Sequence, residues 1–252
     1  MNKIYMRGGN SGLYSPGNYR VTSNGCLRMI LVRSKCGQPV ANHRERFTFD
    51  IGILCEKILA DKWKAENKQV ELDVEVEEHI IDNVYIMGHI DAILEGRIIE
   101  EKSVQSVNSF KKIMKGGLYK KENIVQLLQY MMIKEHTEGT LLYTTVGYFG
   151  EKSEPGQQRE FKVRITEDDK IIVNEQEESG IRLIDILYHR QQAAECLMKK
   201  IIFTERPEPI EMPWYPCDSC WLRPMCDNWD SNHDDNEFWS SVNNHLDKVG
   251  KR

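Results

Sequence analysis

The chain has 252 residues, which is long enough for one large domain, or one domain with an appendage, and for a sizeable core. Hydrophobic residues make up 40% and charged residues 29%, as in soluble globular proteins, and no apolar run reaches the 18 residues of a membrane-spanning helix. The net charge of −5 does not indicate a nucleic-acid-binding protein, so any contact with DNA requires a local basic patch.

The first 24 residues are polar and lack the apolar segment of a signal peptide, so we expect a cytoplasmic protein with no membrane partner. Seven cysteines in that compartment argue against a disulfide framework. They favour ligation of a metal ion or a cluster.

The first regular element expected is a helix over residues 44–63, where apolar residues recur at helical spacing: Phe47, Ile51, Leu54, Ile58 and Leu59. Gly52 and Glu56 are four residues apart on one side of this helix. The glycine allows a close approach, and the glutamate is placed to reach a neighbouring sheet. A surface Glu56 paired with a nearby lysine explains the pattern equally well.

Residues 70–76 alternate apolar and acidic side chains, which predicts a half-exposed strand. A second strand over residues 84–90 continues into the segment 88–102, which we expect to form a hairpin around a tight turn at Glu95-Gly96. Because side chains alternate across a strand, Glu100 and Lys102 share one face and Glu101 lies on the other. The hairpin brings Asp91 towards the face of Glu100 and Lys102.

This convergence of two carboxylates and one amine suggests a specific chemistry. Carboxylates without imidazole or thiolate partners suit a hard divalent cation such as Mg²⁺ or Mn²⁺. A lysine beside them can hold an attacking water molecule, so the arrangement is typical of phosphodiester cleavage. The alternative is that these residues are solvated charges on an edge hairpin.

A lysine-rich connection follows, with Phe110 and Tyr119 interleaved among Lys111, Lys112, Lys115, Lys120 and Lys121. In an acidic protein this local positive charge favours a patch that contacts phosphates beside the metal site, over a solvated helix face. Residues 123–134 then predict a helix with Gln126 and Tyr130 on one face.

The remaining core elements are strands over 141–149 and 161–165, a further strand over 170–174, and an amphipathic helix over 181–200.

A proline-rich connector over 206–216 leads to three closely spaced cysteines, Cys217, Cys220 and Cys226. Three thiolates need a fourth ligand to complete a tetrahedral zinc site or an iron–sulfur cluster. The candidates are Cys26, Cys36, Cys55 and His233, and we prefer Cys26 because it lies in a loop-like approach to the first helical segment.

Taken together, these motifs resemble the PD-(D/E)XK nuclease superfamily, and within it the RecB-like iron–sulfur branch. That branch includes nucleases of the Cas-four type, AddB nuclease domains and phage or viral relatives. Gly88-x-x-Asp91 fits the acidic strand motif, Glu100-Glu101-Lys102 fits (D/E)-x-K, and Gln126-x-x-x-Tyr130 is similar to the helix motif that faces DNA in RecB-like members. The pattern of Cys26 with the three C-terminal cysteines is similar to the split cluster of this branch.

The resemblance implies an α/β fold with a restriction-endonuclease-like core, in which a central mixed sheet is flanked by helices. It places the nuclease core in residues 46–205. Residues 1–45 and 206–252 would then contribute a cluster subdomain that joins both chain ends around a [4Fe-4S] cluster, with zinc as the alternative occupant. The sequence departs from the family at Glu56, where a histidine ligand is usual. A carboxylate there remains a competent ligand, and it shifts the expected metal from Mn²⁺ towards Mg²⁺.

The implied function is metal-dependent DNA cleavage, as an exonuclease or end-processing enzyme with single-stranded DNA favoured, in recombination, replication, repair or CRISPR adaptation. Asp91, Glu100, Glu56 and Glu101 (through its main-chain carbonyl) would hold one or two cations, while Lys102 orients the water. DNA is the expected partner, alongside proteins of such a complex, and a phage or viral origin would place the protein in the host cytoplasm. The alternatives are a non-catalytic DNA-end-binding adaptor and a zinc-stabilised RNA-binding protein. The oligomeric state stays open.

Overall fold

The computed structural model describes residues 18–21, 27–30, 43–82, 84–148 and 154–198, together with positions 222, 223, 226, 240 and 244. Three of the four cysteines expected to hold a cluster, Cys26, Cys217 and Cys220, lie outside the described residues. The fourth, Cys226, is half-buried, and its amide donates a 3.0 Å hydrogen bond to the carbonyl of Leu222. The cluster subdomain and the domain boundaries therefore stay predictions.

The expected strands and helices of the core are confirmed in chain order, with longer or shorter ends. The elements are β1 (Asn18–Arg20), α2 (His43–Ala65), β2 (Val70–Ile81), β3 (Val84–Leu94), β4 (Arg97–Val104), α3 (Val107–Ser109), the π-helix η1 (Phe110–Lys115), α4 (Lys121–Ile133), β5 (Glu138–Thr145), β6 (Gln158–Ile165), β7 (Ile171–Val173), β8 (Gln176–Glu177) and α5 (Leu183–Met198). Within the described part of the chain, no helix is both long enough and apolar enough to cross a bilayer.

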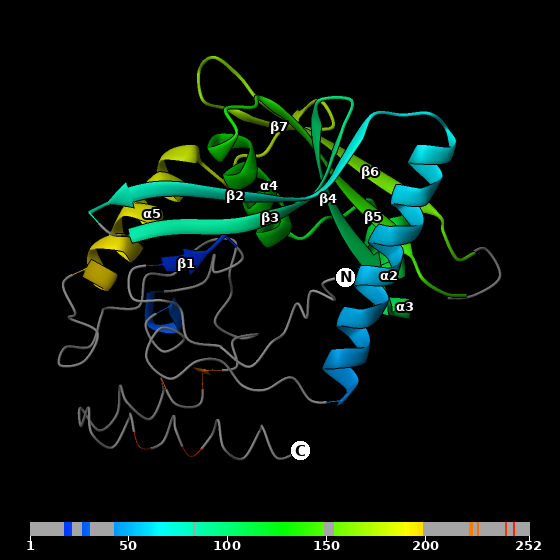
Figure 1. Ribbon diagram of the computed structural model, residues 1–252, viewed down its shortest axis with the longest axis horizontal. Helices are drawn as coiled ribbons and strands as arrows, with labels where there is room; N and C mark the ends of the chain where they lie inside the picture. Colours follow the sequence, from blue (N-terminus) through cyan, green and yellow to red (C-terminus); the bar gives the residue numbers. More distant parts are fainter. Residues whose placement is uncertain are drawn as a thin grey trace, which may run out of the picture.

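The strands form one sheet in the order β1-β3-β4-β5-β6-β7-β8, with β2 paired to the other edge of β3. The pairs β1–β3 and β4–β5 are parallel, and the remaining pairs are antiparallel. The expectation of a central mixed sheet flanked by helices is therefore confirmed. Figure 1 shows the long β2–β3 ribbon, with α2 beside β4 at one end and α5 at the other.

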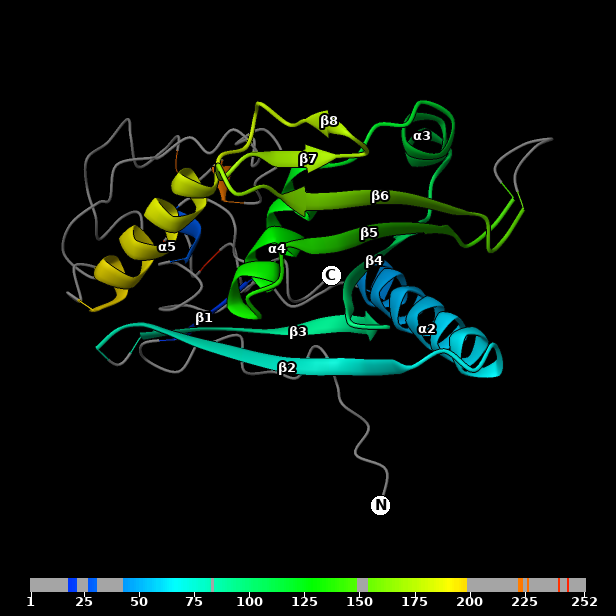
Figure 2. The same cartoon turned by 90° about the horizontal axis from the view of Figure 1, so that it is seen from above.

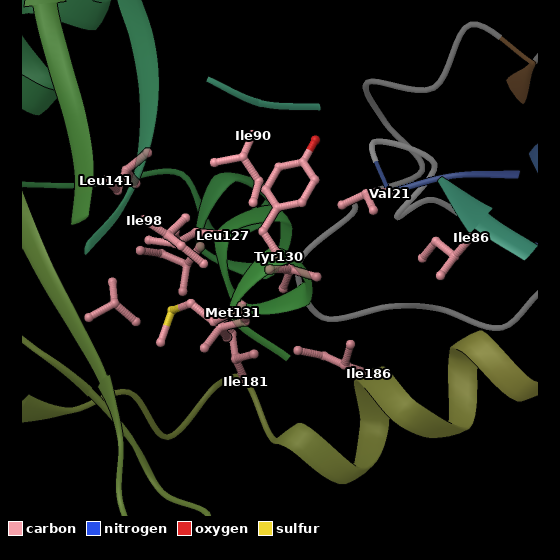
Figure 3. Packing of buried hydrophobic residues seen from close by; sticks show 14 of the residues in the cluster. Val21, Ile86, Ile90, Ile98, Leu127, Tyr130, Met131, Leu141, Ile181 and Ile186 are labelled. Carbon is pink, nitrogen blue, oxygen red and sulfur yellow. The ribbon is translucent and has the colours of Figure 1, made fainter. Parts of the chain in front are cut away.

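Two hydrophobic cores lie on opposite faces of this sheet. The larger core joins α4, α5 and η1 to the strands, and includes Ile90 and Ile98. Figure 3 shows Tyr130 and Met131 of α4 in this core, together with Ile186 of α5. The smaller core packs Leu59 and Trp63 of α2 against Ala92, Ile99 and Leu142. Because Ile98 and Ile99 are neighbours in β4 and belong to different cores, the alternation of side chains along β4 separates the two faces.

Helix α2 differs from its sequence-based description in one respect. Its buried face is formed by Leu59, Ala60 and Trp63, near its C-terminal end. Much of the apolar stripe seen in the sequence is exposed, since Phe47, Leu54 and Ile58 are 55–61% accessible. Phe47 and Leu54 lie on the opposite side of the helix from the buried Trp63, so this stripe faces away from the sheet.

Candidate active site

The hairpin predicted at residues 88–102 is confirmed. Strands β3 and β4 pair antiparallel from Leu94↔Arg97 to Ala92↔Ile99. The tight turn at Glu95-Gly96 has φ values of 50° and 80° at its two central residues. Positive φ at both positions is the conformation whose twist matches a two-residue hairpin, and glycine adopts it without a steric penalty.

The sheet forks immediately beyond this hairpin. Along one edge β3 pairs with β1 as far as Met87, and it pairs with β4 only from Ala92 onward. Residues 88–91 lie between these two pairings, with β2 on their other edge. At the fork the amide of Glu101 donates a 2.8 Å hydrogen bond to Oδ2 of Asp91. Asp91 therefore lies where β3 and β4 separate, as the sequence predicted for a shared site.

Glu100 and Lys102 share the face of β4 that meets the larger core. Glu100 is completely buried, and the Lys102 ammonium forms an ion pair with its Oε1. The other oxygen, Oε2, is buried and accepts no hydrogen bond from the described residues. Burial first, and then the charge of Asp91, raise the pKa of Glu100 to about 8. A solvated edge hairpin is therefore excluded for these charges.

Lys102 is held in its charged form by the same carboxylates. Burial of the amine disfavours its charge, but Glu100 and Asp91 outweigh that effect and raise the pKa of Lys102. Its side chain is 30% exposed, whereas Glu100 is 0% exposed. The amine therefore lies between the buried carboxylate and solvent, where it can contact a water molecule or a phosphate oxygen.

Glu101 lies on the other face of β4, as side-chain alternation predicted. It is buried, and its Oε1 has no hydrogen-bond partner among the described residues. Burial, followed by the charge of Asp91, raises its pKa to about 8. Asp91 thus influences the glutamates on both faces of β4, which is consistent with its place at the fork.

Helix α2 runs alongside β4 and brings Glu56 to the site. The side-chain amide of Gln105, just after β4, donates a 3.1 Å hydrogen bond to the carbonyl of Thr48. One turn further along α2, a Cβ at Gly52 would lie 4.0 Å from Oγ of Ser103. One more turn brings Glu56, which is half-buried and whose charge contributes to the raised pKa of Glu100 and Glu101. Gly52 and Glu56 therefore face the site from the predicted helix.

Tyr130 of α4 lies beneath the fork. Its side chain is 1% exposed, and the ring approaches Gly88 so closely that a Cβ there would be 2.6 Å from Cε1 of Tyr130. Burial, then the charge of Glu100, raise the pKa of the Tyr130 hydroxyl, while hydrogen bonding from Gln126 lowers it. Of the predicted pair, Tyr130 is thus close enough to Glu100 to feel its charge, and Gln126 is bound to Tyr130. Because Tyr130 is buried, it packs beneath the site and does not offer its ring as a surface for DNA.

The first part of the lysine-rich segment, Phe110–Lys115, forms the π-helix η1, a rare conformation that often occurs at functional sites. Arg159 of β6 fixes it by donating a 2.7 Å hydrogen bond to the carbonyl of Met114. Tyr143 of β5, the register partner of Lys102, accepts hydrogen bonds from the amide of Lys120 and the side chain of Asn123. These residues of β5 and β6 were not identified from the sequence, because no local pattern relates them to the lysines.

The five lysines do not share one environment. Lys111, Lys112, Lys115 and Lys120 are exposed. Lys121 is half-buried, and it forms a 3.1 Å ion pair with Glu178. The exposed four are therefore better placed to contact phosphates than Lys121 is.

The chemistry of the donors fits a divalent cation. Asp91, Glu100, Glu101 and Glu56 supply oxygen donors, and two buried carboxylate oxygens among them lack hydrogen-bond partners in the described part of the chain. In the described residues, however, no three histidine, cysteine, aspartate or glutamate side chains are gathered as a ready metal-holding group. A divalent cation bound to Glu100 and Glu101 would lower their pKa again, because it favours the charged carboxylates.

Comparisons with known proteins bear on the fold. No family model matches the sequence, and no curated protein matches it either. The crystal structure of SSO0001 aligns over 85% of this chain and 88% of its own, at 18% identity and a TM-score of 0.50, so the two share a fold. An alkaline exonuclease (LHK-Exo) from Laribacter hongkongensis aligns over 74% of this chain and 88% of its own, at 11% identity and a TM-score of 0.47. A phage related exonuclease from Haemophilus somnus 129PT aligns over 69% and 79%, at 13% identity and a TM-score of 0.43.

Proposed function

We propose that this protein is a metal-dependent DNA nuclease that hydrolyses phosphodiester bonds. We further propose that it acts at DNA ends, with single-stranded DNA favoured, in recombination, replication, repair or CRISPR adaptation. The observation that carries the proposal is the ion pair between the buried Glu100 and the partly exposed Lys102 at the fork between β3 and β4, next to Asp91. A fully buried carboxylate with an unpartnered oxygen is costly for folding, so its presence is best explained by a ligand for that oxygen.

Each residue has a role that follows from its position. Asp91 and Glu100 would bind Mg²⁺ or Mn²⁺, with further oxygen ligands from Glu56 and from the main-chain carbonyl of Glu101. A bound divalent cation supplies Lewis acidity, which activates water and stabilises the charge that develops on the phosphate. Lys102, charged and partly exposed, would hold the attacking water or a phosphate oxygen.

Supporting residues complete the proposed site. The Tyr130 ring packs under Gly88 and lies beside Glu100, so it fixes the buried carboxylate from below. Gln126, one turn earlier on α4 and half-buried, would contact the DNA backbone. The exposed lysines of the π-helix and the following loop would bind flanking phosphates, because they supply positive charge in an otherwise acidic chain. The loop is tied to the site strand, since the amide of Lys120 is bound to Tyr143, the register partner of Lys102.

The second part of the proposal concerns a [4Fe-4S] cluster held by Cys26, Cys217, Cys220 and Cys226, with zinc as the alternative occupant. It is supported by the spacing of these cysteines and by the sequence resemblance. Such a cluster would act as a clamp that closes a chain segment of about 190 residues, since loop-closing constraints have their largest effect on long loops.

Digestion of end-labelled single-stranded and duplex DNA tests the catalytic proposal. With Mg²⁺ or Mn²⁺ the protein should shorten labelled strands, and EDTA should stop the reaction. A protein that binds DNA ends without cleaving them under any metal would be the adaptor instead. Iron-free protein with stoichiometric zinc that prefers RNA would indicate the other alternative.

A further inference from the structure

Helix α2 extends beyond the site and exposes aromatic and aliphatic side chains there. Phe49 is 57% exposed and Ile53 is 39% exposed. Large apolar side chains at these exposures lose favourable burial unless something covers them, so a cluster of them beside a functional site suggests a binding surface.

The helical period places Phe49 on the same face as Glu56. These residues are seven apart, so their directions differ by only about 20° around the helix axis, and they are separated by about 10 Å along it. Ile53 lies between them on that side. Phe47 is nine residues from Glu56 and therefore points to the opposite side of the helix, although it is equally exposed, at 61%.

The contacts of α2 with β4 show where Phe49 lies relative to the proposed site. Thr48 is bound to Gln105, Gly52 approaches Ser103, and Glu56 acts electrostatically on Glu100. Moving from Glu56 towards Phe49 is thus a movement along β4 towards its C-terminal end. Phe49 lies at the level of Gln105, at the exit of the strand that carries Glu100 and Lys102. Figure 2 shows α2 lying against the end of β4 in this way.

We propose that Phe49, with Ile53, stacks against unpaired bases of the DNA strand that enters the site. Unlike paired bases, unpaired bases expose their aromatic faces, and stacking on an aromatic side chain is a general mode of single-strand recognition. Phosphates of the same strand would meet the exposed lysines of the π-helix. This inference rests on the proposed nuclease function, and it assigns the preference for single-stranded ends to a named side chain.

A binding experiment without metal tests the stacking surface directly. Fluorescence anisotropy in EDTA would compare a labelled oligothymidine, a duplex of equal length, and a single strand of equal length carrying abasic sites. The proteins would be the wild type, Phe49→Ala, Phe49→Tyr and Phe47→Ala. Phe47→Ala is the matched control, because it removes an equally exposed ring from the opposite side of the same helix.

The expected result is a loss of oligothymidine affinity in Phe49→Ala of about fivefold to a hundredfold, the range for one stacked base. Phe49→Tyr should bind oligothymidine like the wild type, because it keeps an aromatic ring. Phe47→Ala should also bind like the wild type. On the abasic strand Phe49→Ala and the wild type should bind alike. Unchanged oligothymidine binding in Phe49→Ala, or equal losses on normal and abasic strands, would overturn the stacking proposal.

Two further outcomes separate this inference from its premises. Wild-type protein that binds none of the three DNA probes would remove the proposed nuclease function, and the stacking surface with it. A change in molar mass of Phe49→Ala by light scattering would assign Phe49 to contact between copies of the chain and would also overturn the proposal. If the wild type binds DNA but Phe49→Ala and Phe47→Ala have equal affinity for oligothymidine, only the stacking proposal is overturned.

Discussion

The amide of Glu101 is bound to the side chain of Asp91, at 2.8 Å, in place of a main-chain carbonyl of β3. If the β3–β4 ladder continued in the same register, Glu101 would face Ile90, two positions beyond the last pair, Ala92↔Ile99. The carboxylate of Asp91 therefore ends the ladder and satisfies the amide at the same time. In doing so it holds the two strands apart at the place where Glu100 is buried.

The role of Glu56 can be tested by metal titration. If it is a ligand, Glu56→Ala should need a higher Mg²⁺ concentration for half-maximal cleavage, while Glu56→His should restore activity with a stronger demand for Mn²⁺. Glu66, exposed just after the same helix and paired with Lys68, is a matched control carboxylate. Wild-type metal dependence in Glu56→Ala would make Glu56 a surface charge.

The lysines of the π-helix make a salt-dependent prediction. Replacing Lys111, Lys112 and Lys115 with glutamine should reduce the slope of log affinity for DNA against log salt by about 0.7 to 0.9 for each phosphate that the variant no longer neutralises. Lys121→Gln should change the slope less, because that amine is already paired with Glu178. If all four substitutions changed the slope equally, the distinction between the exposed lysines and the paired Lys121 would be wrong. If none changed it, the lysines would belong to a solvated face.

The raised pKa of Glu100 predicts how the stability of metal-free protein depends on pH. Because the folded state binds this proton more tightly than the unfolded state, the free energy of unfolding should fall as pH rises from about 4.5 to about 8. Glu101 should contribute in the same direction. Urea denaturation at the two pH values would measure this change in the free energy of unfolding. Because Glu100→Gln cannot ionise, its free energy of unfolding should fall less than that of the wild type. A decline as steep as that of the wild type would contradict the burial of a titrating Glu100.

The proposed cluster predicts distinct behaviour for individual cysteines. Cys26→Ser and Cys220→Ser should give colourless protein with a lower melting temperature, because binding of the cluster to the folded state adds stability. Cys36→Ser, Cys55→Ser and Cys196→Ser should keep the brown colour and its absorbance near 400 nm. Iron and acid-labile sulfide should be present at about four of each per chain. Stoichiometric zinc without sulfide would overturn the iron assignment. If Cys36→Ser loses the colour and Cys26→Ser keeps it, the fourth ligand is Cys36 and not Cys26.

Much of the central hairpin could be predicted from the sequence, because its signals are local. The Glu95-Gly96 turn and the alternation of Glu100, Glu101 and Lys102 depend on residues that are neighbours in the chain. The same holds for Gln126 and Tyr130, which are one helical turn apart. Local periodicity therefore identified these residues and the faces on which they lie.

The features that make the hairpin a site depend on distant parts of the chain. The burial of Glu100 results from β4 lying between β3 and β5, and β5 is about 40 residues away. The support of the lysines by Arg159, and the ion pair of Lys121 with Glu178, likewise join segments with no common pattern. The exposure of Phe47 also could not be predicted. Helical periodicity shows which residues of α2 share a face, but it does not show which face packs against the sheet.

The rates of DNA cleavage by three proteins test the central claim most directly. Wild type, Glu100→Gln and Glu95→Gln would be compared on end-labelled DNA with Mg²⁺ or Mn²⁺. Glu95→Gln changes an exposed carboxylate at the turn of the same hairpin. Glu100→Gln should lose a factor on the order of 10² or more in rate while staying folded and binding DNA, and Glu95→Gln should cleave like the wild type. Cleavage by Glu100→Gln at the wild-type rate would contradict the proposed active site.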